Sequence, residues 1–223
     1  MHIEPGVVDG AKMALSYATG AASLAIAAKL AYDTIREDGG VPGLVLRSVA
    51  ATLAVFIFFE LLPHFAVGIS DVHFILGTTL LLILGAGPAA IGLIAGRAIQ
   101  GILFAPSDLP MYAVNVTTLI MPLWAIHELS RRMIPDGTAY VDLKYLDVLK
   151  LSLVYQGGII AWVAFWALYG QGFGAENLTA VLSFGAAYLL VVVLEPLADL
   201  AVLWVAKHLP RSSWTPHRLH GAA

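Results

Sequence analysis

The chain has 223 residues, of which 59% are hydrophobic and only 12% are charged, and its formal net charge is −3. Soluble domains carry about 25% charged residues, so this composition excludes an ordinary soluble globular protein and indicates a polytopic membrane protein. The chain contains no cysteine, which excludes disulfides and thiolate metal ligands.

Apolar runs account for nearly all of the sequence. A spanning helix needs about 20 residues, so we predict an all-α membrane protein with a single domain over residues 1–223, a bundle of about seven transmembrane helices. Only Gly85-Ala86-Gly87-Pro88 separates the third run from the fourth, which predicts a tight helical hairpin. The seven runs are, in chain order, Ala11 to Tyr32, Leu44 to Leu62, His73 to Ala86, Pro88 to Phe104, Tyr112 to Leu129, Leu146 to Tyr169 and Leu178 to Lys207.

The positions of the basic residues predict the orientation of the bundle. Ten of the twelve Lys and Arg residues flank the first connection, the fifth connection or the end of the last run. Basic loops remain in the cytoplasm, so we expect the N-terminus outside, the C-terminus inside, and residues 209–223 as a cytoplasmic tail. They are Lys29, Arg36, Arg47, Arg131, Arg132, Lys144, Lys150, Lys207, Arg211 and Arg218.

The first residues, Met1 and His2, have the groups of a nitrogen chelate. A free α-amine, the amide nitrogen of His2 and its imidazole can close five- and six-membered rings on one metal ion, and a further histidine would complete a four-nitrogen site. Such donors suit Ni(II), Cu(II) or Co(II). A secretory signal peptide needs a basic start, whereas Glu4 and Asp9 precede Lys12, so we expect a mature N-terminus and residues 1–10 as a metal-binding segment.

Two histidines compete for the fourth ligand position. His73 begins the third run, and the predicted topology puts it on the same outer face as His2. Taken by itself, His73 would favour an interfacial histidine at a helix end; together with His2 and the amine beside it, a metal ligand is favoured. His64 lies in the same outer connection, and we favour an ordinary loop histidine over a ligand that binds the metal ion as it enters. Glu60, one helical turn earlier, adds a negative charge at the outer entrance to the site, which attracts cations.

The fourth run contains packing residues and one charge. Gly92 and Gly96 have the GxxxG spacing that lets membrane helices approach closely. A lone charge such as Arg97 is costly inside a membrane, so it requires a partner. Glu195 and Asp199 in the last run are the acids at related depth, and a structural ion pair is favoured over a transport relay.

Successive motifs resemble the cobalt/nickel transport permease family of the CbiM/NikM type, whose members are the substrate-capture components of energy-coupling-factor ABC transporters. The resemblance is clearest over residues 1–121. It is carried by Met1-His2-Ile3 followed by Gly6, by Ser70-Asp71-Val72-His73-Phe74-Ile75-Leu76-Gly77, by Gly85-Ala86-Gly87-Pro88-Ala89-Ala90, by Ile99-Gln100-Gly101-Ile102-Leu103-Phe104, and by Asn115 in Ala113-Val114-Asn115-Val116.

The resemblance implies a site and a role for its residues. In that family the metal is held in a roughly square-planar arrangement, which assigns the ligands to the amine of Met1, the amide and imidazole of His2, and the imidazole of His73. The matching asparagine, Asn115, would orient a ligand imidazole. From the residues alone, an interhelical hydrogen bond is an equal alternative for Asn115. No cofactor is expected beyond the transported Co(II) or Ni(II).

The resemblance also implies partners. We expect an ATP-driven importer subunit in a bacterial plasma or inner membrane, working with a transmembrane coupling subunit, cytoplasmic ATPases and, in some systems, a small accessory membrane subunit. The chain has no Gly-x-x-x-x-Gly-Lys loop, so it is not the ATPase, and we expect no enzymatic activity. No basic stacking surface points to nucleic acid. The alternatives are an ion-coupled secondary carrier and a metal-dependent intramembrane enzyme or sensor.

Overall fold

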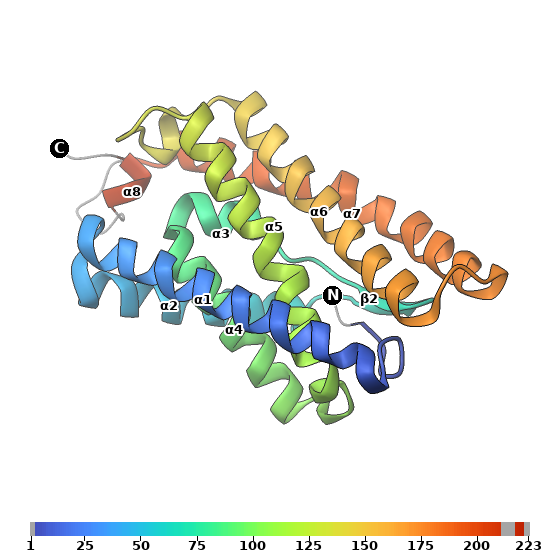
Figure 1. The fold of residues 1–223 in the computed structure, drawn as a ribbon. Coiled ribbons are helices and arrows are strands. Elements are labelled where there is room, and N and C mark those ends of the chain that lie inside the picture. Colours follow the sequence, from blue (N-terminus) through green and yellow to red (C-terminus); the bar gives the residue numbers. More distant parts are fainter. Residues whose placement is uncertain (1–2, 211–216, 221–223) are drawn as a thin grey trace.

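The computed structural model describes residues 3–210 and 217–220, and most of them are helical (Figure 1). Among these residues, six helices are long and apolar enough to cross a membrane. The main helices are α1 (Met13–Glu37), α2 (Gly40–Phe56), α3 (Gly77–Leu84), α4 (Ala86–Leu103), α5 (Tyr112–Met133), α6 (Tyr145–Gln171) and α7 (Ala175–His208). The short elements are 3-10 turns at Gly10–Lys12 (η1), Pro106–Met111 (η3) and Tyr140–Asp142 (η4), a π-helical turn at Ile57–Leu61 (η2), strands β1 (Phe65–Val67) and β2 (Ser70–Val72), and α8 (His217–His220).

The third predicted span is only partly helical, so the prediction of a helix over His73 to Ala86 is wrong at its start. Strand β2 ends at Val72, and helix α3 begins only at Gly77. Eight helical residues extend about 12 Å, far less than the roughly 30 Å hydrocarbon core. The helix cannot begin earlier because Leu76 has a left-handed backbone with φ of 52° and the amide nitrogens of Ile75 and Leu76 donate to a side chain of α7.

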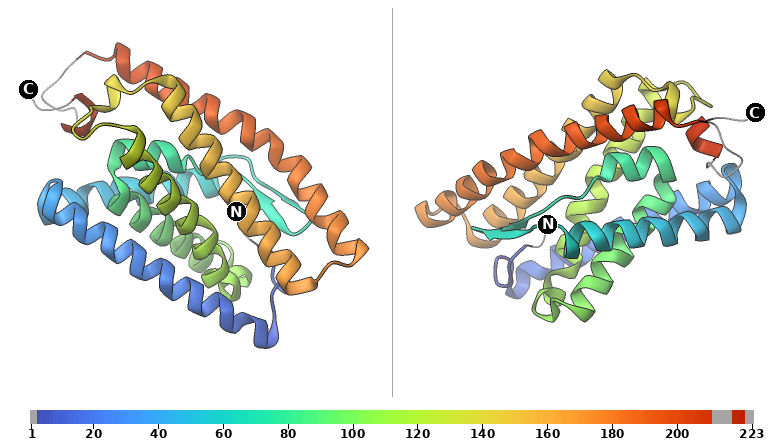
Figure 2. Two further views of the ribbon diagram at one scale, coloured as in Figure 1. Left: turned by 45° about the horizontal axis from the view of Figure 1, so that its top comes forward. Right: turned by 180° about the vertical axis from the view of Figure 1, so that it is seen from behind.

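The helices form a bundle with α4 and α5 at its centre. Helix α4 packs against α1, α2 and α5, helix α5 also packs against α6, and α6 pairs with α7 (Figure 2). The short α3 lies among α4, α5, α6 and α7. The predicted close packing of α4 is confirmed, since a Cβ atom added to Gly92 would lie 2.4 Å from the Cβ of Ala51 in α2. The predicted hairpin between the third and fourth runs is also present, with Gly85 between α3 and α4.

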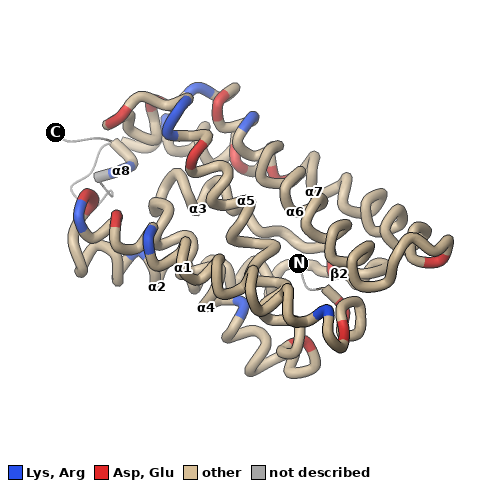
Figure 3. Tube along the Cα trace, viewed as in Figure 1, with Lys and Arg blue, Asp and Glu red and all other residues tan. Residues whose placement is uncertain are grey.

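The bundle has two chemically different ends. At one, which we call the hairpin end, lie the β1–β2 hairpin, the start of α1, the segment Ala105–Met111 and the α6–α7 turn. At the other, the basic end, lie the α1–α2 turn, the α5–α6 connection and α8. Figure 3 shows Lys and Arg gathered at the basic end, as the sequence predicts. Within the described residues, the exceptions are Lys12, just before α1, and Arg97, within α4.

A small ion-pair network closes the basic end. Asp38, between α1 and α2, lies 2.7 Å from Nη1 of Arg47 and 2.6 Å from Nη1 of Arg218 in α8. Burial acts to raise the pKa of Asp38, but hydrogen bonds from the two guanidinium groups outweigh it, and the pKa lies below its usual value. The carboxylate therefore ties the end of α1 to α2 and to the C-terminal part of the chain.

Candidate metal centre

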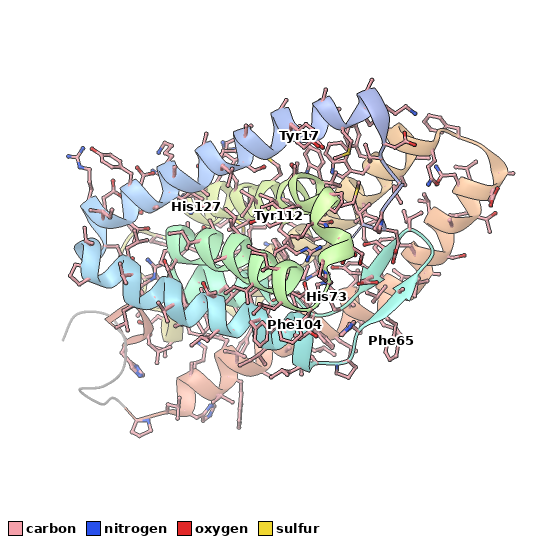
Figure 4. All side chains as sticks on the ribbon, turned by 90° about the horizontal axis from the view of Figure 1, so that it is seen from below. Tyr17, Phe65, His73, Phe104, Tyr112 and His127 are labelled. Carbon is pink, nitrogen blue, oxygen red and sulfur yellow. The ribbon has the colours of Figure 1, made fainter. Side chains whose placement is uncertain are left out.

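His73 lies inside the bundle at the junction between β2 and α3 (Figure 4). Its side chain is only 2% exposed, and its ring centroid is 4.4 Å from that of Phe59. Its Nδ1 is 3.0 Å from the carbonyl oxygen of Phe74. Burial lowers the pKa of His73 to about 4, with a smaller contribution from Arg97, although the Phe74 carbonyl acts in the opposite direction. The imidazole is therefore neutral at physiological pH, the form that binds metals.

The start of the described chain is fixed beside the β-hairpin. Ile3 is 1% exposed and forms an antiparallel bridge with Ser70 of β2. The amide nitrogen of Glu4 donates to the carbonyl oxygen of Ile69 at 3.1 Å. The N-terminal segment thus pairs with the edge of the hairpin. Its partner there, Ser70, lies three residues before His73 in the chain. Met1 and His2, two of the predicted ligands, lie outside the described residues.

Asn115 anchors this segment from the middle of the bundle. It is fully buried in α5, and its Oδ1 accepts a hydrogen bond from the amide nitrogen of Ile3 at 2.9 Å. Its Nδ2 is buried and has no hydrogen-bond partner among the described residues. The second-shell role predicted for Asn115 stays a prediction, and the contact that the structure shows is with backbone next to His2.

His64 and Glu60 have a different setting from His73. His64 directly precedes β1, whose Phe65 pairs with Val72, so its backbone lies at the same end of the hairpin as that of His73. Its side chain is nevertheless exposed, with Nδ1 3.3 Å from the carbonyl oxygen of Leu62. Glu60 is partly exposed in the π-helical turn. Their role in admitting metal remains a prediction.

Arg97 is fully buried, and its predicted pairing with Glu195 or Asp199 is wrong. Its Nη2 lies 3.4 Å from Asp108 Oδ2, and its Nη1 lies 3.3 Å from Gln100 Oε1. The reason is the segment Pro106–Met111, which packs against α4 and carries Asp108 to the guanidinium group.

Carboxylates outnumber cations around this part of the hairpin end. The pKa of Glu4 is raised by burial and then by the negative charges of Asp71 and Asp108. These three acids come from the N-terminal segment, β2 and the segment after α4, and Arg97 is the cation among them. Such a field favours cations at the surface. Among the residues that the structure describes, however, no three His, Cys, Asp or Glu side chains are grouped as a complete metal site.

Comparison with known proteins identifies the chain's relatives. Two solved structures are similar, one described as a truncated transition metal transporter and one as a transition metal transporter. Each has a TM-score of 0.69 and 18% sequence identity; they cover 94% and 93% of this chain, and the similarity covers 100% and 92% of theirs. At this identity the likeness establishes the fold. No curated protein sequence matches.

A family match extends the assignment beyond the fold. The model of the cobalt uptake substrate-specific transmembrane region, CbiM, matches residues 2–211. This range includes all six long helices, the hairpin and His73. The chain is therefore a multi-pass membrane protein that belongs to the CbiM family of substrate-specific components for cobalt uptake.

Proposed function

We propose that this chain captures Co(II) or Ni(II) at the hairpin end through four nitrogens. The ligands are the amine of Met1, the amide nitrogen and imidazole of His2, and the imidazole of His73. Membership in a cobalt-uptake family supports a transition metal as the substrate. Nitrogen donors in a tetragonal arrangement select such metals over oxygen-preferring cations.

The docking of Ile3 is the observation that carries the proposal. Ile3 pairs with Ser70 in antiparallel register. Ser70 lies three residues before His73 in the chain, so Ile3 is held beside the strand that leads to His73. Two residues reach at most about 7 Å, so the amine cannot lie far from Ile3.

The setting of His73 supports its part in the site. A hydrogen on Nδ1 donates to the Phe74 carbonyl oxygen, which leaves Nε2 as the basic nitrogen of the ring. Second-shell contacts of this kind fix the tautomer and orientation of metal-binding histidines.

Charge supports the orientation of the bundle, and the uptake family supports an inward direction of transport. The basic end corresponds to the cytoplasmic side, which leaves the hairpin end outside and the C-terminal part inside. We propose that delivery depends on a separate transmembrane coupling subunit and cytoplasmic ATPases, as in energy-coupling-factor importers. The basic segment from Ser130 to Lys150 and the last helices, α6 and α7, are the proposed contact surfaces for the coupling subunit.

A binding experiment tests the site. Ni(II) affinity of the purified protein would be compared among the natural chain, His2→Ala, His73→Ala and a form in which the amine of Met1 is acetylated. We expect each change to weaken binding by at least about 100-fold, since each removes a direct ligand and second-shell losses alone reach this size. An acetylated form that binds as tightly as the natural chain would show that the terminal amine is not a ligand.

A transport experiment tests the energy source. Metal uptake would be measured in cells that produce this chain with and without the coupling subunit and the ATPases. We expect accumulation only with all components, and accumulation by the chain alone would identify a secondary carrier.

A further inference from the structure

Helix α7 brings two fully buried carboxylates to the start of α3. Glu195 is 0% exposed and Asp199 is 1% exposed, one helical turn apart. In the described part of the chain, neither forms an ion pair with Lys, Arg or His. Acidic side chains are rare within membrane-spanning helices and mark functional positions there. Their hydrogen-bond partners therefore indicate what they do.

Glu195 binds the backbone that follows His73. Its Oε1 accepts from the amide nitrogen of Ile75, and its Oε2 accepts from the amide nitrogen of Leu76 at 3.0 Å. Gln156 Nε2 also donates to Oε2 and is oriented by the hydroxyl of Tyr188, which donates to Gln156 Oε1 at 2.6 Å. The two backbone N–H groups cannot reverse their roles, so both oxygens of residue 195 must be acceptors.

The segment that Glu195 holds has an unfavourable backbone conformation. Leu76 is the only residue other than glycine with a positive φ among those described. Such a residue persists only where its surroundings over-determine it. Gly77 follows, and a Cβ atom there would lie 2.3 Å from Cζ of Tyr155 in α6, so no larger residue fits. The segment from Ile75 to Gly77 is thus held between α6 and α7.

His73 precedes this held segment by two residues. On its other side, strand β2 ends at Val72 and is paired with β1. The backbone of His73 is therefore fixed at both ends, by the hairpin before it and by the Glu195 contacts after it. Phe74, the residue between His73 and Ile75, supplies the carbonyl oxygen that meets Nδ1 of His73.

We propose that Glu195 is a positioning residue of the metal centre, which sets where the His73 imidazole lies by binding the amides of Ile75 and Leu76. This inference rests on the proposed function, in which His73 is a ligand. Glu195 does not touch the metal. It links the outer site to α7, one of the proposed contact surfaces for the coupling subunit.

Asp199 offers a matched control. It is equally buried and also binds the start of α3, but it accepts from the hydroxyl and the backbone amide of Thr79 and from the hydroxyl of Ser152, the last at 2.6 Å. An asparagine can replace this carboxylate, because its oxygen can accept from Thr79 while its NH₂ group donates to the Ser152 hydroxyl, which can accept as well as donate. At residue 195 an amide cannot serve, because either orientation would point its NH₂ group at a backbone N–H group.

The test compares Glu195→Gln, Asp199→Asn and His73→Ala in the full chain. Ni(II) affinity and the d–d absorption band of the bound ion would both be measured, after thermal unfolding has established that each variant is folded. We expect Glu195→Gln to weaken binding by about 10- to 100-fold, the loss typical when a group that orients a metal ligand is changed. We also expect the absorption band to shift. Asp199→Asn should bind within about threefold of the natural chain, with an unchanged band.

The outcomes separate the two proposals. If His73→Ala binds as the natural chain does, the proposed function fails. If His73→Ala loses binding while Glu195→Gln keeps its affinity and band, only the present inference fails. Equal losses of Ni(II) affinity in Glu195→Gln and Asp199→Asn would indicate a general loosening of the fold and would also overturn the positioning role of Glu195. Weaker binding by Glu195→Gln with an unchanged absorption band would overturn it for the same reason. Should Glu195→Gln not fold, Glu195→Asp keeps two acceptors and replaces it. We then expect a smaller loss with a shifted band, and natural binding would overturn the inference.

Discussion

The hairpin end and the basic end of the bundle are held by different interactions. At the hairpin end, buried neutral groups such as Asn115 Oδ1 and the Ile3 amide fix backbone to helix at short distances. At the basic end, Asp38 binds Arg47 and Arg218 in partly exposed ion pairs. Buried hydrogen bonds are directional, whereas exposed ion pairs contribute little and weaken in salt. Changes at the hairpin end should therefore affect metal binding, and changes at the basic end should affect stability.

Among the changes that compare the two ends, the largest effect is expected at Asn115. Asn115→Ala removes the acceptor of the Ile3 amide and leaves a buried N–H group without its partner. We expect Ni(II) affinity to fall by about 10- to 100-fold, as for other second-shell losses, measured by competition with a chelator.

Thr118→Val is the control for that change. Thr118 is equally buried in α5, but its hydroxyl bonds only the Val114 carbonyl oxygen of its own helix. Equal affinities for Asn115→Ala and Thr118→Val would contradict a special role for Asn115.

A change at Gly92, in α4 between the two ends, should lower the stability of the fold without acting on one end more than on the other. In Gly92→Ala the new methyl group would lie 2.4 Å from the Cβ of Ala51, and overpacking costs about 1 to 3 kcal/mol. Gly185→Ala in α7 meets no atom within 4 Å and should be neutral or slightly stabilising. Thermal unfolding in detergent compares them, and similar midpoints would show that α2 and α4 are not tightly packed.

A smaller effect is expected at Asp38. Asp38→Asn removes two partly exposed ion pairs and should lower the free energy of unfolding by about 1 kcal/mol, with Ni(II) affinity unchanged. Because the folded-state pKa lies below the ordinary value, this stability is fully present above about pH 4 and is lost as the pH falls through the folded-state pKa. Molar salt should reduce the difference between the two proteins. A loss of metal binding in Asp38→Asn would contradict the division between the ends.

The smallest effect is expected at His64. Its side chain is exposed, and surface changes are usually worth less than about 0.5 kcal/mol, so His64→Ala should alter Ni(II) affinity by no more than about twofold. A larger loss by the same chelator competition would make His64, and not His73, the histidine of the site.

Much of the fold could be predicted from the sequence, because long apolar runs determine spanning helices and basic residues mark one end. The third run could not, since periodicity cannot show that Ile75 and Leu76 donate to Glu195, about 120 positions away. The prediction of a partner for Arg97 failed for a similar reason. The depth of a residue along its helix does not show which neighbouring segment packs against its side chain. An acid in an apolar helix with no base nearby was the signal that could have identified Glu195.

The sequence analysis selected His73 and Asn115 as site residues, but it predicted neither the burial of His73 nor the partner of Asn115. The hydrogen bond from Ile3 depends on the docking of the N-terminal segment as an extra edge of a hairpin. Neither short strand has a pattern that sequence reasoning detects, since three residues are too few for alternation to be recognised.

Electron paramagnetic resonance of the Cu(II)-loaded protein tests the four-nitrogen site, because the splitting by ligand nitrogens reports how many of them bind the ion. We expect four equatorial nitrogens in the natural chain, and fewer in both His73→Ala and the form in which the amine of Met1 is acetylated. A spectrum that neither change alters would contradict a site built from the chain's first residues and His73.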